Sequence, residues 1–128
     1  MIKKTSQSTI AQIILYFLSV LAILAGVSAL AELNGTASDT LVVETWRIVG
    51  LFTFAGLFAL LARRPNSGRG LWSIVIANKL ALAVAGLIFT VQPSKAAGAS
   101  DLIIFDGSIT ILLVIASVLA GVWSISKK

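Results

Sequence analysis

Four long stretches of hydrophobic residues, separated by short polar segments, dominate the pattern of this chain. Each stretch is close to the roughly 20 apolar residues that a helix needs to cross a hydrocarbon core of about 30 Å. Turn and breaker residues, such as Asn34-Gly35 and Pro65-Asn66-Ser67-Gly68, fall between them. Because the connections are short, we expect consecutive helices to pack as antiparallel neighbours. The pattern predicts membrane-spanning helices over residues 10–31, 41–62, 71–91 and 102–124.

The composition agrees with an all-α fold, an integral membrane four-helix bundle running up-down-up-down. Hydrophobic residues make up 58% of the 128 residues, charged residues make up only 12%, and the mean hydropathy is +1.01. A soluble domain is about half apolar and a quarter charged. A water-soluble fold of this size could not bury so much apolar surface. We therefore expect residues 1–128 to form a single membrane domain whose first partner is the lipid bilayer.

The basic residues are unevenly divided between the segments that flank the spans, and this predicts the orientation. One set of segments carries Lys3, Lys4, Arg63, Arg64, Arg69, Lys127 and Lys128, whereas the two other connections carry only Lys95. Short segments rich in lysine and arginine stay in the cytoplasm. We therefore expect a multi-pass protein of the bacterial inner membrane with both termini cytoplasmic. The acidic residues then lie on the outer side: Glu32, Asp39, Glu44, Asp101 and Asp106.

Two further features bear on how the helices meet the membrane. Tryptophan is enriched at bilayer interfaces, so we expect Trp46 at the outer interface and Trp72 and Trp123 at the inner one. The first span, between Lys3-Lys4 and Ala29-Leu30-Ala31, also fits the pattern of a cleavable signal peptide. Its apolar stretch is longer than the usual 7 to 15 residues, roughly, of such a peptide. This length favours a retained helix.

The residue types that the chain lacks exclude several kinds of chemistry. Cysteine and histidine are absent, and Met1 is the single methionine. Disulfides, thiol redox chemistry, the usual zinc sites and haem ligation by these side chains are therefore excluded, and we expect no metal or other cofactor. The net charge of +5 and the pI near 10.1 do not indicate nucleic-acid binding, because most basic residues flank the hydrophobic stretches.

Four ionisable residues lie inside the predicted spans: Glu44, Arg47, Lys79 and Asp106. A charge at membrane depth costs from about 3 to more than 10 kcal/mol, so such residues are normally paired and face the bundle interior. At a rise of about 1.5 Å per residue, Lys79 lies roughly 18 Å from the outer edge and the other three lie roughly 5–9 Å from it. Because the acids lie on the outer side, we expect Lys79 to reach outwards.

The four charges sum to zero and predict one polar cluster in the outer half of the bundle. Glu44 and Arg47 share a helix face at the spacing i, i+3. Three interpretations of the cluster stay open at this point: structural pairing, a site for a ligand, proton or lipid, and an interfacial N-cap made by Asp106 before Gly107. The expected members are Glu44, Arg47, Lys79 and Asp106, with Asn78 and Thr110 nearby.

Small residues indicate where helices approach closely, because lipid provides no hydrophobic drive for helices to associate. Such residues occur in all four spans, and they predict interior packing of a monomeric bundle. Contact between copies in a homo-oligomer is the alternative. The pairs are Ala22 with Gly26, Gly50 with Gly56, Ala83 with Gly86, and Ala120 with Gly121.

The second span carries a resemblance to a known family. It opens with Glu44-Thr45-Trp46-Arg47-Ile48-Val49-Gly50, continues through a stretch rich in glycine and leucine, and closes with Arg63-Arg64-Pro65. This arrangement resembles the DoxX-like membrane proteins, which are small four-helix bacterial chains of about this length. Some DoxX proteins are associated with quinone-linked thiosulfate oxidation or with membrane oxidoreductase complexes. The resemblance implies the four-helix architecture and an accessory role.

Three functional hypotheses follow from the sequence. The first is a non-catalytic accessory or structural subunit that docks on a membrane-protein partner. The second is a small transporter or channel that uses Lys79 and Asp106. The third is a quinone- or lipid-binding subunit of a membrane oxidoreductase, with Arg47 and Lys79 facing an oxygen or phosphate of the ligand. The chain has no nucleophile–base pair, metal-binding set or phosphate loop, which favours the first hypothesis and argues against an enzyme.

Overall fold

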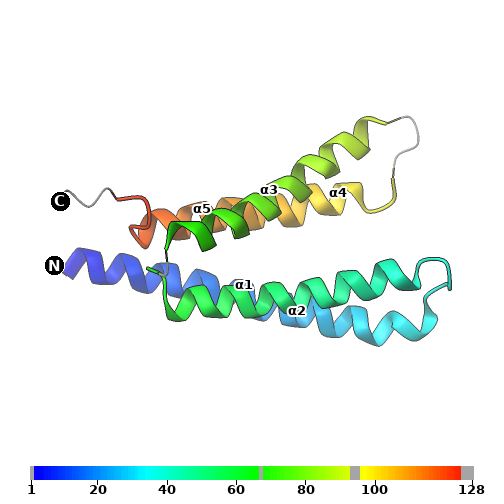
Figure 1. The fold of residues 1–128 in the computed structure, drawn as a ribbon, viewed down its shortest axis with the longest axis horizontal. Coiled ribbons are helices and arrows are strands. Elements are labelled where there is room, and N and C mark those ends of the chain that lie inside the picture. The colour runs from blue at the N-terminus through cyan, green and yellow to red at the C-terminus, as the bar shows by residue number, and fades with distance from the viewer. Residues whose placement is uncertain (1, 67, 93–95, 125–128) are drawn as a thin grey trace.

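Two helical hairpins, one from each half of the chain, make up the computed structural model of this protein (Figure 1). The structure describes residues 2–66, 68–92 and 96–124. The first hairpin consists of α1 (Ile2–Glu32), a short 3₁₀ turn (Leu33–Gly35) and α2 (Leu41–Arg63). The second consists of α3 (Arg69–Val91) and a last helix formed by α4 (Ala99–Asp101), a π-helical turn (Leu102–Asp106) and α5 (Gly107–Leu119).

Within the described residues, four helical stretches are long and apolar enough to cross a membrane. They are Ser6–Gly35, Leu41–Arg63, Arg69–Val91 and Ala99–Leu119. The described part of the chain contains no strand. The predicted all-α, four-helix architecture is therefore confirmed, and the protein is a small multi-pass membrane protein.

The two ends of the bundle differ in what they hold. The first helix begins and the last helix ends on the same side, where the α2–α3 turn also lies (Figure 1). We call this side the terminal end. The opposite side, where α1 and α3 end and α2 and α4 begin, is the loop end. Successive helices alternate in direction between these two ends.

Two helix boundaries differ from the sequence-based prediction by several residues. The first helix begins at Ile2 and not near residue 10. The polar segment before residue 10 contains no proline or glycine, so the helix continues past the end of the apolar stretch. The last helix covers Ala99–Leu119 and not residues 102–124. Hydrophobicity alone therefore overestimated the extent of this helix at its terminal end.

A Schellman motif at Gly121 ends the last helix. Gly121 has a φ of 70°, a left-handed conformation that glycine adopts without steric cost. Its amide donates to the carbonyl of Val118 (2.9 Å), and the amide of Val122 donates to the carbonyl of Ser117 (3.1 Å). These two bonds satisfy carbonyls that a helix end otherwise leaves without a partner. The chain turns here although the sequence stays apolar through Trp123.

The buried core lies in the terminal half of the bundle. Its members come from the early turns of α1 and α3 and from the late turns of α2 and α5, all of which lie near the terminal end. Phe58, Trp72 and Leu113 are the large side chains that meet there from three different helices. The complete cluster is Ala11, Leu15, Leu18, Phe58, Leu61, Ala62, Trp72, Val75, Leu113 and Ala116.

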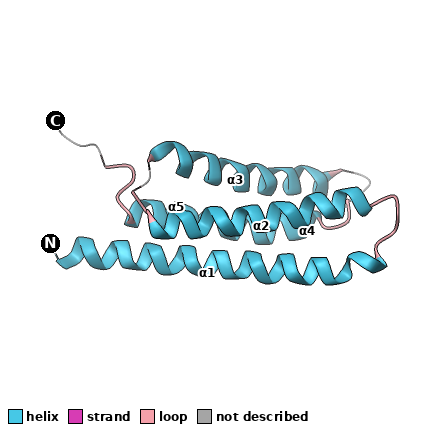
Figure 2. Cartoon of the chain, turned by 60° about the horizontal axis from the view of Figure 1, so that its bottom comes forward, coloured by secondary structure: helices cyan, strands magenta, loops and turns pink. Residues whose placement is uncertain are grey.

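The helices pack closely within each hairpin, and the two hairpins separate towards the loop end. α1 packs along α2, α3 packs along the last helix, and α1 also packs on α5. The hydroxyl of Ser19 on α1 donates to the carbonyl of Ala55 on α2 (2.8 Å) and pins the first hairpin. Figure 1 shows the hairpins diverging towards the loop end, and Figure 2 shows α3 farthest from α1. The loop-end halves therefore have less protein around them than the terminal halves.

The predicted small-residue contacts form at some positions and not at others. A Cβ added at Gly26 would lie 3.0 Å from the ring of Phe52, so this glycine brings α1 close to α2. A Cβ at Gly86 would lie 2.8 Å from the carbonyl oxygen of Ala99, so this glycine brings α3 close to α4. At Gly50 and Gly56 a Cβ would meet nothing within 4 Å, so the expected packing role of these two residues is wrong.

Trp72 is a core residue, and the prediction that it lies in an interfacial belt is wrong. Its side chain is fully buried, and its indole Nε1 donates to the carbonyl of Pro65 in the α2–α3 turn (2.9 Å). Trp46, in contrast, keeps 77% of its surface exposed on α2. A tryptophan in a sequence does not show which side of the helix it faces, and here the first turn of α3 faces inwards.

We expect Trp72→Phe to lower the free energy of unfolding by about 1–3 kcal/mol, because it removes one buried hydrogen bond and leaves a small cavity. Trp46→Phe is the matched control, and we expect it to change stability by less than about 0.5 kcal/mol. Reversible unfolding in detergent micelles, followed by far-UV circular dichroism, measures both. Equal effects of the two substitutions would contradict the assignment of Trp72 to the core.

Candidate functional site

The most unusual feature of the interior is a lysine buried at mid-helix in α3. Only 7% of the surface of Lys79 is exposed, and its Nζ lies 2.9 Å from Oδ1 of Asp106. The same ammonium group lies 4.2 Å from the centroid of the Phe54 ring on α2. Lys79, Asp106 and Phe54, which we call the charged cluster, thus join three helical elements. The lysine connects the two hairpins because Phe54 belongs to the first and Asp106 to the second.

Lys79 faces inwards because of its position on α3. The buried residues of this helix follow a helical spacing of three and four, and Lys79 occupies the middle of that stripe. The aromatic and aliphatic members, Trp72 and Val75, fill the terminal half of the stripe, and the small members, Ala83 and Gly86, occupy the loop-end half. The absence of a side chain at Gly86 lets the backbone of α4 approach α3 at Ala99.

Asp106 is the last residue of the π-helical turn, and this turn sets where its carboxylate points. A π-turn adds one residue to a helical turn, which rotates the residues before it relative to those after it. The side-chain hydroxyl of Thr110 donates a hydrogen bond to the backbone carbonyl of Asp106 (2.7 Å), at the end of this widened turn. The turn is also held from the side, because Leu102 and Ile103 pack against Gly86 of α3.

The charged cluster is electrically neutral and largely enclosed by protein. The side chains of Lys79 and Asp106 keep 8% and 12% of their exposure, and their charges cancel. The Phe54 ring presents its negative face to the remaining surface of the ammonium group. Among the described residues, no buried side-chain nitrogen or oxygen lacks a hydrogen-bond partner. The pairing therefore offsets the high cost of placing a charge in the membrane interior.

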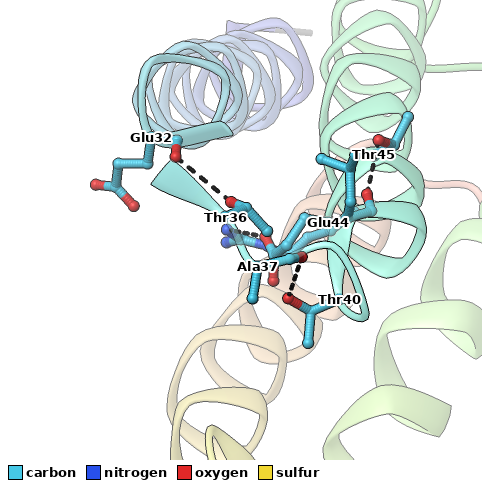
Figure 3. A network of polar contacts seen from close by, with 8 residues as sticks. Glu32, Thr36, Ala37, Thr40, Glu44 and Thr45 are labelled. Atoms are coloured by element: carbon cyan, nitrogen blue, oxygen red, sulfur yellow. Dashed lines mark hydrogen bonds and ion pairs between the residues drawn. The ribbon is translucent and has the colours of Figure 1, made fainter. Parts of the chain in front are cut away.

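Glu44 and Arg47 form a second, separate ion pair near the loop end. Nε and Nη2 of Arg47 lie 2.7 Å and 2.6 Å from Oε2 of Glu44. Both side chains are partly open, at 52% exposure for Arg47 and 31% for Glu44. Figure 3 shows Glu44 beside the α1–α2 loop, where the hydroxyls of Thr36 and Thr40 donate to backbone carbonyls. This pair belongs to the polar rim of the loop.

The single four-charge cluster expected from the sequence is therefore not formed. Within the described part of the chain, no hydrogen bond or ion pair joins Glu44 or Arg47 to Lys79 or Asp106. The reason is geometric: Glu44 and Arg47 satisfy each other on one helix at i, i+3 spacing, and the inward stripe of α3 brings only Lys79 to Asp106. The four charges therefore form two separate neutral pairs, Glu44 with Arg47 and Lys79 with Asp106.

The other predicted members of the cluster divide in the same way. Thr110 is buried and contacts Asp106, whereas Asn78 is exposed on α3 next to the buried Lys79. The alternative in which Asp106 caps a helix beginning at Gly107 is wrong. Asp106 makes no side-chain capping bond, and its backbone is helical on both sides.

Phe54 and the π-turn are the parts of the charged cluster that sequence reasoning missed. Phe54 is one of six phenylalanines, and its sequence neighbours carry no signal that distinguishes it. Its one detectable feature is its position two turns after Arg47, on the same face of α2. In the described residues, no three histidine, cysteine, aspartate or glutamate side chains gather in a geometry that could hold a metal ion.

We expect Phe54→Leu to lower the free energy of unfolding by about 1–2 kcal/mol, because leucine keeps much of the apolar contact and loses the cation–π interaction with Lys79. The matched control is Phe105→Leu, since Phe105 is 65% exposed. Thermal unfolding of both variants in the same detergent tests the assignment. If Phe105→Leu were as destabilising as Phe54→Leu, the aromatic contact with Lys79 would contribute nothing specific.

No protein-family model, curated protein or solved structure matches this chain. The geometry of the charged cluster and the arrangement of the two hairpins are therefore the basis for assigning a function.

Proposed function

We propose that this protein is a non-catalytic accessory subunit of the bacterial inner membrane. In this proposal the charged cluster holds the two hairpins together, and the diverging loop-end halves contact a membrane-protein partner. The observation that carries it is the pairing within the charged cluster, since the Lys79 ammonium group contacts both Asp106 and Phe54. A site that binds a substrate keeps polar groups available for it, and no buried side-chain group of the described residues is unpaired.

The charge distribution supports an orientation with both termini in the cytoplasm. Arg63, Arg64 and Arg69 lie at the terminal end and are exposed, whereas Glu32 and Asp39 lie at the loop end. Positive residues in short loops favour the cytoplasmic side of the membrane. Reporter fusions after Arg64 and after Asp39 test this orientation, with cytoplasmic activity expected for the first and periplasmic activity for the second.

A relationship to the DoxX-like proteins is part of the same proposal. It is supported by the acid and arginine that open α2, Glu44 and Arg47, and by the arginine turn that closes it. In the structure these two residues form an exposed pair at the loop rim. Such a pair is suited to docking, because exposed charges contribute to the choice and orientation of a partner more than to stability.

The test of the accessory role uses a variant that lacks both charges. Removing one member of a buried pair strands the other, but replacing both with apolar residues of similar size is often tolerated. We therefore expect Lys79→Met/Asp106→Leu to fold and to remain in the same native membrane assembly as the wild type. Blue-native electrophoresis of mildly solubilised membranes from the native host measures this, with the matched variant Lys79→Met as the unpaired control.

Reconstitution into proteoliposomes supplies the second half of the test. For an accessory subunit we expect no proton or cation flux above that of protein-free vesicles. The proposal is wrong if the wild type migrates only as a free chain in native membranes. It is also wrong if the double variant folds normally and leaves the assembly, because the charges would then have a role beyond holding the hairpins.

A second candidate function is proton-coupled transport through the Lys79–Asp106 pair. The π-turn favours it, because such turns occur frequently at functional sites, and Asp106 keeps 12% of its side-chain exposure. This candidate predicts flux in proteoliposomes that Asp106→Asn abolishes. The same measurement therefore separates the two functions.

A further inference from the structure

The terminal end of the bundle carries basic residues and no acid. The five acidic residues of the chain all lie away from this end, either at the loop end or near the middle of the bundle. They are Glu32, Asp39, Glu44, Asp101 and Asp106. In contrast, Arg63 ends α2, Arg64 follows it and Arg69 begins α3, and all three are exposed. Lys3 and Lys4 belong to the first turn of α1 in the sequence. Among the described residues, no acidic side chain lies at this end.

A hollow of about 230 Å³ opens at this end, and Arg69 is one of the residues that line it. It lies between the α2–α3 turn and the turn that follows α5, and it is lined by Asn66, Gly68, Arg69, Gly121 and Val122. The walls are held in place by Arg69, whose Nε donates to the carbonyl of Val122 (3.1 Å) and whose Nη2 donates to the carbonyl of Ser124 (2.9 Å). These bonds orient the guanidinium group along one wall.

The third guanidinium nitrogen of Arg69, Nη1, makes no hydrogen bond to any described residue. Asn66 also lines the hollow, and it is exposed. Both are donors, so the hollow offers hydrogen bonds to an anion in a surface that already attracts negative charge. Phosphate oxygens accept hydrogen bonds from arginine especially well.

The four membrane-spanning helices determine which anion meets this surface. They place the terminal end at the level of the lipid headgroups, where phosphate groups are present at high local concentration. Basic pockets between helices at this level are suited to anionic headgroups. We propose that the hollow at the terminal end binds the headgroup of an anionic phospholipid, with Arg69 and Asn66 contacting the phosphate and Arg63 and Arg64 holding the surrounding charge.

Lipid titration of the purified full chain, followed by native mass spectrometry, tests this proposal. The probes are short-chain phosphatidylglycerol and short-chain phosphatidylcholine with the same acyl chains. We expect the anionic lipid to bind at least about tenfold more tightly than the zwitterionic one, and we expect the preference to shrink as salt concentration rises. Equal affinity for the two lipids would overturn the proposal.

Three variants locate the site. Arg63→Gln/Arg64→Gln removes two exposed charges, and we expect the affinity for phosphatidylglycerol to fall by about fivefold for each arginine. Arg69→Gln is expected to weaken binding as well, and circular dichroism checks that the loss of its bonds to Val122 and Ser124 leaves the helices intact. Arg47→Gln removes one arginine at the loop end and is the matched control, with unchanged affinity expected.

Two further results would overturn the proposal. One is an effect of Arg47→Gln as large as that of the Arg63 and Arg64 substitutions, which would indicate general attraction to the chain and not a site at the terminal end. The other is displacement of the lipid by inorganic phosphate at equal concentration, which would indicate a site for a free anion. Retention of the lipid under that challenge supports the proposal, because the acyl chains then contribute to binding.

Discussion

We expect Lys79→Met to lower the free energy of unfolding by about 3–5 kcal/mol, because it leaves the Asp106 carboxylate buried without a partner. The two groups are 2.9 Å apart and nearly inaccessible, so no solvent replaces the missing ammonium group. The loss also removes the contact with Phe54 and with it a link between the hairpins. Equilibrium unfolding in detergent measures the change.

The control for this prediction is the double variant without either charge. Lys79→Met/Asp106→Leu removes the need for pairing, so we expect its stability to lie within about 1 kcal/mol of the wild type or above it. A double variant as unstable as Lys79→Met would show that the charges contribute more than mutual neutralisation. In that case the Phe54 contact or the geometry of the π-turn would depend on the ion pair itself.

The second large effect is expected at Gly86. An alanine Cβ there would lie 2.8 Å from the Ala99 carbonyl oxygen, 2.9 Å from Cβ of Leu102 and 3.0 Å from Cγ1 of Ile103. Backbone and side chains would have to move apart, which costs about 1–3 kcal/mol. Because Ala99 precedes the π-turn and Leu102 and Ile103 belong to it, we expect the last helix to shift and the Lys79–Asp106 contact to weaken.

Gly56→Ala is the matched control for Gly86→Ala, because an added Cβ at Gly56 meets nothing within 4 Å. Alanine is the better helix former, so we expect this variant to be unchanged or up to about 1 kcal/mol more stable. Thermal unfolding in detergent compares the two. A destabilised Gly56→Ala together with a tolerated Gly86→Ala would contradict the packing of α3 on the last helix.

Much of this architecture is predictable from the sequence because lipid imposes strong constraints on it. The bounds of α2, Leu41–Arg63, differ by one residue from the predicted 41–62. The inward position of Lys79 is also predictable, since it shares a helical face with Ala83 and Gly86. A membrane-buried lysine needs an acid, and Asp106 is the acid nearest to it in depth that is not already paired at i, i+3.

Other details of the structure were not predictable, because they depend on contacts between residues that lie far apart in the sequence. Nothing in the sequence Leu102–Asp106 indicates a π-turn, and the residue that packs closely against this turn, Gly86, comes from another helix. The sequence predicts Glu44 and Arg47 in the interior, because both lie within the predicted span 41–62. In the structure they pair on the rim of the loop, where the hairpins diverge and little protein covers them.

The length of α1 has a consequence for how the bundle fits a bilayer. At about 1.5 Å per residue, the 31 residues of Ile2–Glu32 extend over roughly 46 Å, against roughly 31 Å for the 21 residues of Ala99–Leu119. An apolar helix that much longer than the hydrocarbon thickness would have to tilt or thicken the membrane. Most of the extra length of α1 is the polar segment before residue 10. A polar segment does not need to be covered by hydrocarbon, so it creates no hydrophobic mismatch. We therefore expect this segment of about two helical turns to extend past the hydrocarbon, with α1 nearly upright beside its shorter neighbours.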